Sequence, residues 1–389
     1  MHTITTDIRF VGAEDDNLDL FEAQYPIPAG ISYNSYFIAD SSVAVVDAVD
    51  MRRCSDWLAA VADSCAALGR LPEYLIVQHM EPDHSGSVRA FVDRYPGATI
   101  VCTAKAAGML ANFFEDVDFS CRCRIVADGD TLCLGSHTLS FVTAPMVHWP
   151  EVMMTLDETD GVLFSADAFG SFAMSDSAEA WDAEARRYYT NIVGRFGPSV
   201  QAVMKKLAGR KFGIVAPLHG PVLSENLAHY WHLYDKWSRY EPETRGVLVA
   251  YASVYGGTAE AARLVASQLR AVGAPEVVLL DLCRHDVSYA VAEAFRLSHM
   301  VLCSVTYDGA LFPAMHSFLH HLQSKRLCGR TVALVENGSW APVAARLMAD
   351  ELAKMKAMTV VEPVLTIHSR LHEADRSTLL ALAANLLQD

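Results

Sequence analysis

Apolar residues in the first part of the chain form short runs typical of strands and longer periodic stretches typical of helices. Two strand-like segments come first, residues 33–38 and 43–46, separated by the polar turn Ala39-Asp40-Ser41-Ser42. A helical stretch over residues 51–68 carries apolar side chains at Trp57, Val61, Cys65 and Leu68. Further strands are predicted at residues 74–77, 99–102, 132–134 and 139–143, and helices at residues 88–95 and 104–114. This mixed order predicts an α+β fold, a layered sheet sandwich with helices outside.

The pattern changes near residue 243. A helical stretch over residues 178–196 and an aromatic-rich segment over residues 225–240 lead into Glu241-Pro242-Glu243-Thr244-Arg245-Gly246, a polar segment typical of a linker. Beyond it, strands at residues 247–251, 300–303 and 332–336 alternate with helices such as residues 260–271. Regular alternation predicts an α/β fold with a doubly wound parallel sheet. We therefore expect two domains, residues 1–243 and 244–389.

A short loop after the predicted strand at residues 74–77 is rich in metal-binding side chains. Within six positions it contains His79, Glu81, Asp83 and His84. Pro82 and Gly86 in the same loop argue against a regular helix, so we expect extended backbone. Alternate residues of an extended segment point to one side, so His79, Glu81 and Asp83 can converge while His84 turns toward a second ion. The alternative is an ordinary polar loop of solvated charges.

Three further candidate ligands each follow an apolar run. His148 comes after the strand predicted at residues 139–143, Asp167 after residues 161–165, and His219 after residues 212–216. Taken singly, a loop histidine or aspartate is more often structural or solvated. Because all three come after predicted strands, we expect them to meet the first four side chains at one rim of a sheet.

The turn after the strand at residues 247–251 has the composition of a phosphate-binding loop. Backbone N–H groups, the hydroxyls of Ser253 and Thr258, and the dipole of the following helix can bind an anion there. No lysine follows, so the turn is not an ATP-binding P-loop. An ordinary strand-to-helix connection is the alternative. The expected binding residues are Ser253, Val254, Tyr255, Gly256, Gly257 and Thr258.

Two later loops supply what a flavin ring needs. They follow the strands at residues 300–303 and 332–336, and their candidate residues are Thr306, Tyr307, Asp308, Gly309, Asn337, Gly338, Ser339 and Trp340. Tyr307 and Trp340 can flank an isoalloxazine by stacking, while backbone amides near Gly309 and Gly338 reach its polar edge. Alternatively, both aromatic side chains only cap the sheet. All three loops lie at the carboxyl ends of strands, where doubly wound sheets bind their ligands.

Composition argues against several classes of function. The net charge is −15 and the acidic excess lies mainly in residues 1–240, which argues against nucleic acid as a partner. No apolar run approaches the roughly 18 residues of a membrane span, and residues 1–7 lack the features of a signal peptide. Nine cysteines without a CxxC pair are typical of reduced thiols rather than of a disulfide framework or a zinc knuckle. We therefore expect a cytoplasmic protein without membrane contact.

The set of candidate metal ligands carries a family resemblance. The spacing His79-x-Glu81-x-Asp83-His84, followed by His148, Asp167 and His219, resembles that of the metallo-beta-lactamase fold. In the zinc hydrolases of that fold the second motif position is histidine, whereas Glu81 stands there, as in the flavodiiron proteins, also called A-type flavoproteins. More oxygen ligands suit iron that cycles between Fe(II) and Fe(III). The later loops resemble flavodoxin, and a lactamase-like domain followed by a flavodoxin-like domain is the order in the flavodiiron family.

The resemblance implies a metallo-beta-lactamase-like αββα sandwich followed by a flavodoxin-like domain that binds FMN. It assigns one iron to His79, Glu81 and His148, the other to Asp83, His84 and His219, and the bridging position to Asp167. One of Tyr188 and Tyr189 resembles the family's catalytic tyrosine beside the metal ligands, although packing on a helix face explains the pair equally well. Gly338-Ser339-Trp340 continues with Ala341-Pro342 where many members have Gly-Trp, so the aromatic residue that stacks on the flavin stays open.

The implied activity is reduction of O2 to water, of NO to N2O, or of both, at a non-haem diiron site with electrons relayed by FMN. The chain has no cysteine-paired rubredoxin segment, so we expect a separate electron donor such as a rubredoxin or a flavin/NADH reductase. The family also implies a head-to-tail homodimer or a dimer of dimers, in which one subunit's FMN faces the other's irons. A binuclear zinc hydrolase and a non-catalytic flavin/iron redox sensor or electron carrier are the alternatives.

Overall fold

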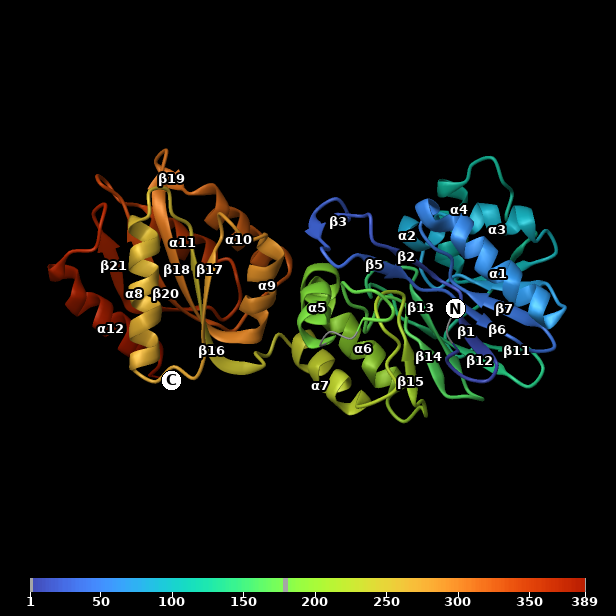
Figure 1. The fold of residues 1–389 in the computed structure, drawn as a ribbon. Helices are drawn as coiled ribbons and strands as arrows, with labels where there is room; N and C mark the ends of the chain where they lie inside the picture. The colour runs from blue at the N-terminus through green and yellow to red at the C-terminus, as the bar shows by residue number, and fades with distance from the viewer. Residues whose placement is uncertain (1–2, 178–180, 389) are drawn as a thin grey trace. The chain divides into compact units, whose positions relative to one another are not determined.

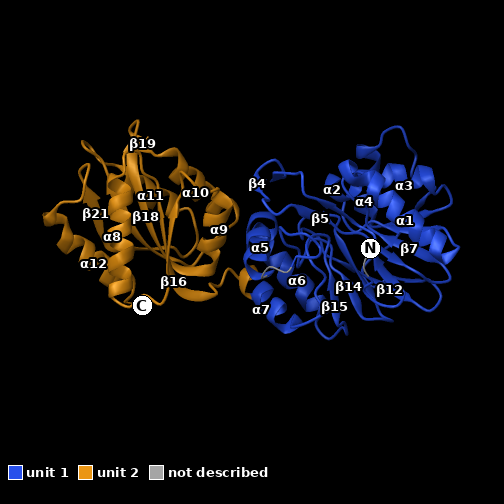
Figure 2. Cartoon of the chain, viewed as in Figure 1, with its two compact units in different colours: residues 1–235 blue, residues 236–389 orange. Residues whose placement is uncertain are grey.

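The computed structural model describes residues 3–177 and 181–388. The chain folds into two compact units, Met1–Asp235 and Lys236–Asp389 (Figure 2). The predicted boundary after residue 243 falls a few residues inside the second unit, and helix α7 (Leu227–Ser238) runs across the division. Residues 178–180, where the predicted helix 178–196 begins, and residues 1–2 of the N-terminal segment lie outside the described residues.

The first unit contains two mixed β-sheets. One has the strand order β1-β6-β7-β8-β9-β10, formed by Ile8–Phe10, Tyr36–Ile38, Val43–Val46, Pro72–Ile76, Thr99–Cys102 and Cys123–Ile125. The other has the order β11-β12-β13-β14-β15, formed by Thr131–Cys133, Thr138–Thr143, Met153–Asp157, Val162–Phe164 and Ile214–Ala216. Two small sheets pair β2 with β5 and β3 with β4, formed by Ala13–Asp15, Ile31–Tyr33, Leu20–Phe21 and Tyr25–Pro26.

The inner faces of the two large sheets share one hydrophobic core. Ile38, Val46 and Val101 of the first sheet cluster with Phe141 and Phe164 of the second. Helices lie outside the sheets (Figure 1), so the αββα sandwich is confirmed. The helical segments are η1 (Met51–Arg53), α1 (Cys54–Leu68), α2 (Pro82–Ser85), α3 (Val88–Arg94), α4 (Ala104–Phe113), α5 (Trp181–Tyr188), the π-helical η2 (Tyr189–Val193), η3 (Gly194–Phe196), α6 (Gly197–Leu207) and α7.

The predicted strand at residues 33–38 is wrong as a single element. β5 ends at Tyr33 and β6 begins at Tyr36, because the two residues between them form other bonds. The Asn34 side chain donates to the carbonyl oxygens of Pro217 at 2.7 Å and Gly220 at 2.8 Å. A side chain that satisfies two buried carbonyls holds their loop in place. The interruption therefore fastens the loop that carries His219.

The second unit has a single parallel sheet with the order β17-β16-β18-β20-β21. Its strands are Val277–Asp281, Thr244–Tyr251, Leu297–Tyr307, Thr331–Asn337 and Thr359–Ile367, and the short β19 (Ala310–Leu311) pairs antiparallel with β18. Numbered along the chain, the order is 2-1-3-4-5, which confirms the flavodoxin-like expectation. The sequence pattern located β16, β18 and β20 but missed β17 and β21.

Alternate residues of these strands face opposite helical layers. Val247 and Val249 of β16 pack with α8 and α12, whereas Leu248 and Ala250 pack with α9, α10 and α11. Both faces are therefore covered, as in a doubly wound sheet (Figure 1). The helical segments are α8 (Gly257–Ala271), α9 (Val287–Arg296), α10 (Pro313–Ser324), α11 (Ala344–Leu352), η4 (Glu373–Asp375) and α12 (Arg376–Leu386). Over the described part of the chain, no helix combines the length and apolar character needed to cross a membrane.

Candidate metal centre and cofactor cavity

Four loops bring the seven predicted metal ligands together. One follows β8, one joins β12 to β13, and the others follow β14 and β15. The ligand atoms of His79, Glu81, His148 and Asp167 all lie within 4.8 Å of one another, and those of Asp83, His84 and His219 form a second group of the same kind. The loops therefore build two adjacent ligand sets from residues far apart in the sequence.

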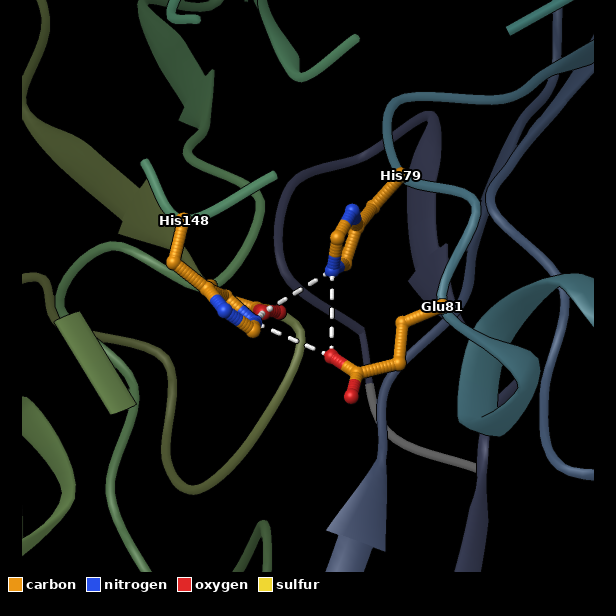
Figure 3. A group of neighbouring side chains, drawn as sticks. His79, Glu81 and His148 are labelled. Atoms are coloured by element: carbon orange, nitrogen blue, oxygen red, sulfur yellow. Dashed lines mark hydrogen bonds and ion pairs between the residues drawn. The ribbon is translucent and has the colours of Figure 1, made fainter. Parts of the chain in front are cut away.

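The first ligand set is centred on three side-chain atoms. His148 Nε2 lies 2.9 Å from Glu81 Oε2, and His79 Nε2 lies 3.3 Å from the same oxygen. Figure 3 shows the two imidazoles and the carboxylate pointing toward one another. Asp167 Oδ2 completes the set at 3.3 Å from His79 Nε2 and 3.1 Å from His148 Nε2.

The second ligand set shares the Asp167 carboxylate. His219 Nε2 lies 3.2 Å from Asp83 Oδ2 and 3.0 Å from His84 Nε2. Asp167 Oδ1 lies 3.5 Å from His84 Nε2 and 4.0 Å from His219 Nε2. One oxygen of Asp167 thus faces each set, which is the arrangement that a carboxylate bridge between two metal ions requires.

The donor atoms fit a pair of metal ions. Both carboxylate oxygens of Asp83 and Oδ1 of Asp167 are buried without a hydrogen-bond partner among the described residues. Buried carboxylate oxygens without partners are costly, and a cation at this position would satisfy them. Four imidazoles and three carboxylates provide nitrogen and oxygen ligands. Such a mixed set is suitable for iron, whereas sulfur-rich and all-oxygen sets are typical of other metals.

The charges of the centre shift the pKa values of its histidines. Burial alone would lower the pKa of His84, but Asp83 and Asp167 outweigh it and raise the pKa to about 9. The pKa of His148 is likewise raised to about 9, because Asp167 and Glu81 outweigh burial. The same pairs hold the pKa of Asp167 well below its ordinary value despite its burial. At neutral pH His84 and His148 are therefore protonated wherever a metal ion does not replace the proton.

The short helix α2 corrects the prediction of extended backbone at residues 79–84. Pro82 stands at the first helical position, where a missing N–H costs nothing, so one helical turn forms over Pro82–Ser85. Asp83 therefore does not share a side with His79 and Glu81, and instead joins the second ligand set with His84. All four loop residues still reach the centre, by a different backbone path.

Contacts outside the ligand sets fix the imidazoles. The Nδ1 atom of His219 lies 2.7 Å from the Ser32 carbonyl oxygen, and Phe21 and Tyr33 pack edge-on against its ring at 5.3 and 5.9 Å between centroids. His79 Nδ1 lies 3.0 Å from Glu151 Oε1. Gly220 has a φ of 78°, and a Cβ there would lie 2.1 Å from Ser171 Oγ, so this position next to His219 requires glycine.

The two predicted catalytic tyrosines point to different places. The Tyr188 ring lies 5.5 Å from that of His219, and its buried hydroxyl has no hydrogen-bond partner among the described residues. Burial raises the pKa of Tyr188 well above its ordinary value, and the carboxylates of Asp167 and Asp83 raise it further. Tyr189 packs instead on Tyr234, 5.0 Å away. Tyr188 is therefore the tyrosine beside the ligands, and its hydroxyl stays protonated.

A cavity of about 430 Å³ adjoins the predicted metal ligands Glu81 and Asp83. Its wall includes Phe21 at the end of β3 and Glu22 and Ala23 in the loop between β3 and β4, none of which the sequence pattern marked as functional. A cavity of this size admits a small molecule to the ligand sets.

The second unit contains a larger cavity at the carboxyl ends of its strands. It measures about 600 Å³ and lies within the range of cofactor sites. Thirteen of the fourteen predicted cofactor residues line it, Gly256 being the exception. The residues that the sequence missed in this lining are Val305, Ala341 and Ser369.

The predicted phosphate turn begins helix α8 within this cavity. Gly256 has a φ of 92° and Gly257 starts the helix, so N–H groups of the first turn point toward the cavity end. Ser253 Oγ accepts the N–H groups of Gly256 and Ala259, each at 3.2 Å, which fixes the turn. Tyr307 and Trp340, the latter 82% exposed, line the cavity through the later loops. A helix N-terminus and aromatic side chains in one cavity fit a phosphate-bearing flavin.

Ser369 belongs to a fourth loop that the sequence pattern did not identify. It follows β21, and its backbone N–H donates to Asn337 Oδ1 at 2.9 Å. A Cβ at Gly257 would lie 2.0 Å from the Ser369 carbonyl oxygen, so the phosphate turn and this loop pack backbone to backbone. The signal that could have found Ser369 is its place after a run of apolar residues, at the same sheet edge as the other loops.

Comparisons with known proteins agree with this architecture. Residues 31–220 match the model of a family described as ODP family beta lactamase. The chain is 28% identical over 353 residues to an anaerobic nitric oxide reductase flavorubredoxin of Aeromonas hydrophila, a match that covers 87% of this chain and 70% of that protein. It is 28% identical over 375 residues to a nitric oxide reductase of Moorella thermoacetica, covering 94% and 92% of the two chains.

Solved structures show the same fold over nearly the whole chain. The rubredoxin oxygen:oxidoreductase of Desulfovibrio gigas matches with a TM-score of 0.91 at 23% identity and covers 100% of this chain and 98% of that chain. The flavodiiron protein of Giardia intestinalis matches with a TM-score of 0.87 at 24% identity, covering 99% and 96%. Together the matches support the flavodiiron protein family for this chain.

The names of these relatives support an oxidoreductase. The predicted family, the lactamase-like first domain and the flavodoxin-like second domain are confirmed. The residue assignments to iron and FMN remain predictions, to which the structure adds the positions described above. Glu151, Ser369 and the loop between β3 and β4 are the parts of this chain that the sequence did not mark.

Proposed function

We propose that this protein reduces O2 to water, NO to N2O, or both. The proposal rests on one observation: the two oxygens of Asp167 face two separate ligand sets in a buried pocket. His79, Glu81 and His148 would hold one iron, Asp83, His84 and His219 the other, and Asp167 would bridge them. Two ions held in this way can bind both ends of a diatomic molecule.

Electron counting supports FMN as the second cofactor. Two Fe(II) ions and one reduced FMN together supply four electrons, which is the number that takes O2 to two waters, whereas two NO need two electrons to give N2O. Ser253, Thr258 and the N-terminus of α8 would bind the FMN phosphate, and Tyr307 and Trp340 would border its ring. The cavity of about 600 Å³ supports this placement.

Residues of the chain itself serve the reaction in three ways. The cavity beside Glu81 and Asp83 admits the small substrate. The protonated Tyr188 hydroxyl donates a hydrogen bond toward the ligand sets, where oxygen atoms of the substrate gain charge. The aromatic packing of Phe21 and Tyr33 on His219 shields this imidazole from solvent.

The electron donor and the assembly are part of the proposal. Relatives named flavorubredoxin and rubredoxin oxygen:oxidoreductase support a rubredoxin-type donor, with a flavin/NADH reductase as the other candidate. We propose a head-to-tail homodimer, alone or as a dimer of dimers, in which one subunit's FMN serves the other's irons. Nine free cysteines support a cytoplasmic location. A dilution series in which a monomer kept full activity would overturn the dimer.

The decisive experiment is anaerobic purification, measurement of iron and FMN per chain, and separate O2 and NO consumption assays after reduction. We expect two irons and one FMN per chain and rapid consumption of at least one gas. Zinc without iron would favour a binuclear zinc hydrolase. Full cofactor content with negligible turnover of both gases would favour a redox sensor or electron carrier.

A further inference from the structure

The buried carboxylate of Glu151 stands behind one metal-ligand imidazole. Its Oε1 lies 3.0 Å from His79 Nδ1 and accepts the backbone N–H of Met80 at 2.9 Å. Neither the Glu151 nor the His79 side chain is exposed to solvent. The Glu151 carbonyl oxygen also accepts the Thr103 hydroxyl at 3.0 Å. Glu151 is thus held on both its backbone and its side chain, and it links the loop of His79 to that of His148.

This contact sets the tautomer of His79. With Nδ1–H donated to Glu151, Nε2 is the nitrogen left for a metal ion, and it lies 3.3 Å from both Glu81 Oε2 and Asp167 Oδ2. A carboxylate that accepts the outer N–H of a ligand histidine raises the basicity of its other nitrogen. His79 therefore donates more electron density to a metal ion than a histidine without such a partner.

Among the described residues, no imidazole of the second ligand set has a carboxylate hydrogen-bonded to its outer nitrogen. The outer nitrogen of His219 meets a neutral backbone carbonyl, that of Ser32, at 2.7 Å. The outer nitrogen of His84 has no hydrogen-bond partner among the described residues. A second buried carboxylate, Asp47, lies nearby, but its Oδ1 accepts the Gln78 N–H and it makes no hydrogen bond to an imidazole among those residues.

The two sets also differ in how a further buried carboxylate contacts each of them. The first set contains Glu81 and one oxygen of Asp167, with Glu151 directly behind His79. The second contains Asp83 and the other oxygen of Asp167, and Asp47 interacts with His84 electrostatically but without a hydrogen bond among the described residues. An additional carboxylate in a buried site stabilises the ion of higher positive charge, because its field is weakly screened there. The two metal positions are therefore chemically different.

We propose that Glu151 is a positioning residue that makes the metal ion on the His79 side the first to be oxidised. This inference rests on the proposed diiron function. Removal of one electron from the reduced centre then converts Fe(II) to Fe(III) beside His79, Glu81 and His148, while the ion beside Asp83, His84 and His219 stays Fe(II). Removal of a second electron oxidises that ion.

The test uses the full chain loaded with iron-57 and FMN, in wild type, Glu151→Gln and Asp47→Asn. The glutamine keeps the acceptor oxygen and the size of the side chain but removes its charge. Asp47→Asn removes a different buried charge without touching an imidazole hydrogen bond, and is the matched control. The reduced proteins are titrated anaerobically with ferricyanide, which takes up one electron per equivalent as ferrocyanide. Mössbauer spectra and the midpoint potentials of both steps are recorded.

FMN absorbance counts the electrons that leave the flavin, and we expect the wild type to show one Fe(III) and one Fe(II) signal once one further electron per chain has left the irons. In Glu151→Gln the midpoint potential of the first oxidation step should rise, and that of the second step should rise less. The Mössbauer signal of Fe(III) after the first step should then come from both iron positions. In Asp47→Asn the midpoint potential of the first oxidation step should stay closer to the wild-type value than it does in Glu151→Gln. The inference is overturned if Glu151→Gln shifts the midpoint potentials of both steps equally, or shifts neither. Should Glu151→Gln bind no iron, Glu151→Asp keeps the charge at a shorter reach and must retain the wild-type order.

The same experiment separates this inference from the proposed function. A wild-type chain that binds no iron overturns both. A wild type that binds two irons and consumes O2 or NO, together with an unshifted Glu151→Gln, overturns only the role of Glu151. Iron content supplies a further readout, because loss of an outer carboxylate partner weakens metal binding by roughly 10- to 100-fold.

Discussion

The metal centre and the cofactor cavity are built in opposite ways. The centre is made of side-chain atoms in a buried pocket, where His79 and His219 have no exposed surface and Asp167 retains 1%. The cavity is made largely of backbone turns and of exposed rings, with Tyr255 99% and Trp340 82% exposed. A fixed set of ligand atoms defines the first site, whereas shape and loop backbone define the second.

This difference determines how each site responds to change. Removing one ligand from the centre leaves buried charges without partners, so the whole site should fail together. Removing one ring from the cavity leaves the backbone turns in place, so binding should weaken in steps. Substitutions in the centre should therefore have all-or-none effects and substitutions in the cavity graded ones.

The largest effect is expected from Asp167→Ala. Both ligand sets lose the carboxylate that they share, so iron content should fall by more than about tenfold and gas consumption should be lost with it. FMN content should stay at the wild-type level, because the cavity lies in the other unit. Metal analysis and FMN absorbance check this on one sample.

Asp160→Ala is the matched control for that variant. Asp160 is exposed in the turn between β13 and β14, on the same hairpin that leads to Asp167. Asp160 lies with His137 and Asp157 in a third group of possible metal-binding side chains, separate from the two ligand sets, so its loss should leave the iron of those sets and the activity unchanged. If Asp167→Ala kept both iron and turnover, the bridging assignment would be lost, and with it the claim that the centre behaves as a unit.

The second prediction concerns the pH dependence of metal loading. Burial lowers the pKa of His84 and His148, but the neighbouring carboxylates raise both to about 9 in the metal-free chain. Below that pH each imidazole must lose its proton before it can bind a metal ion. Metal affinity should therefore rise with pH, about tenfold per unit for each proton released, and level off above about pH 9.

Titration of the metal-free chain with Co²⁺, followed by visible absorption, measures this dependence. The cofactor cavity provides the contrast, since no histidine is among its lining residues. FMN affinity should not follow the same slope above neutral pH. Metal affinity that stayed flat across this range would show that the histidines are already neutral, and the coupling between ligands and carboxylates would be refuted.

The third prediction separates the two tyrosines. In Tyr188→Phe the hydroxyl beside His219 is lost while the ring packing remains, so turnover should fall by about tenfold to a hundredfold. Iron content should not change, because the hydroxyl holds no ligand. Tyr189→Phe, whose ring packs on Tyr234, should retain activity within about twofold. Equal losses in the two variants would mean that the effect comes from helix packing.

The same contrast explains what could be predicted from the sequence. The seven predicted metal ligands could be selected from the sequence because their chemistry is a property of single residues at strand ends, and the structure brings them together. Glu151 was not, since an isolated glutamate after His148 has no distinguishing pattern and only the fold brings it within 3.0 Å of His79. The helical turn at Pro82 was missed because proline was treated as a helix breaker, although it is favourable at the first helical position.

The strands of the second unit also differed in how well the sequence predicted them. The strands β16, β18 and β20 were found from continuous apolar runs, as central parallel strands require. β21 was missed because Pro363 and Glu362 interrupt its pattern, and proline is confined to edge positions such as this one. The loss of β21 from the prediction also removed Ser369 from the expected cavity. The break at Asn34 was not visible, because its partners lie more than 180 residues away.

The smallest expected effect decides which ring borders the flavin. Trp340 has the larger exposed surface, 82% against 46% for Tyr307, and the bound ring would cover it. Aromatic contacts of this kind contribute about 0.5–1.5 kcal/mol, so Trp340→Ala should weaken FMN binding by roughly two- to tenfold. Tyr307→Ala should have a smaller effect. Quenching of FMN fluorescence during titration of the cofactor-free chain measures both.

Leu380→Ala is the matched control, since Leu380 on α12 is also exposed, at 49%, and is not among the residues that line the cavity. It should leave FMN affinity unchanged. Equal affinities in Trp340→Ala and Leu380→Ala would exclude Trp340 as the stacking residue. A complete loss of FMN from Trp340→Ala would contradict the graded response itself, because the backbone turns at Gly257 and Ser369 would then be insufficient to hold the cofactor.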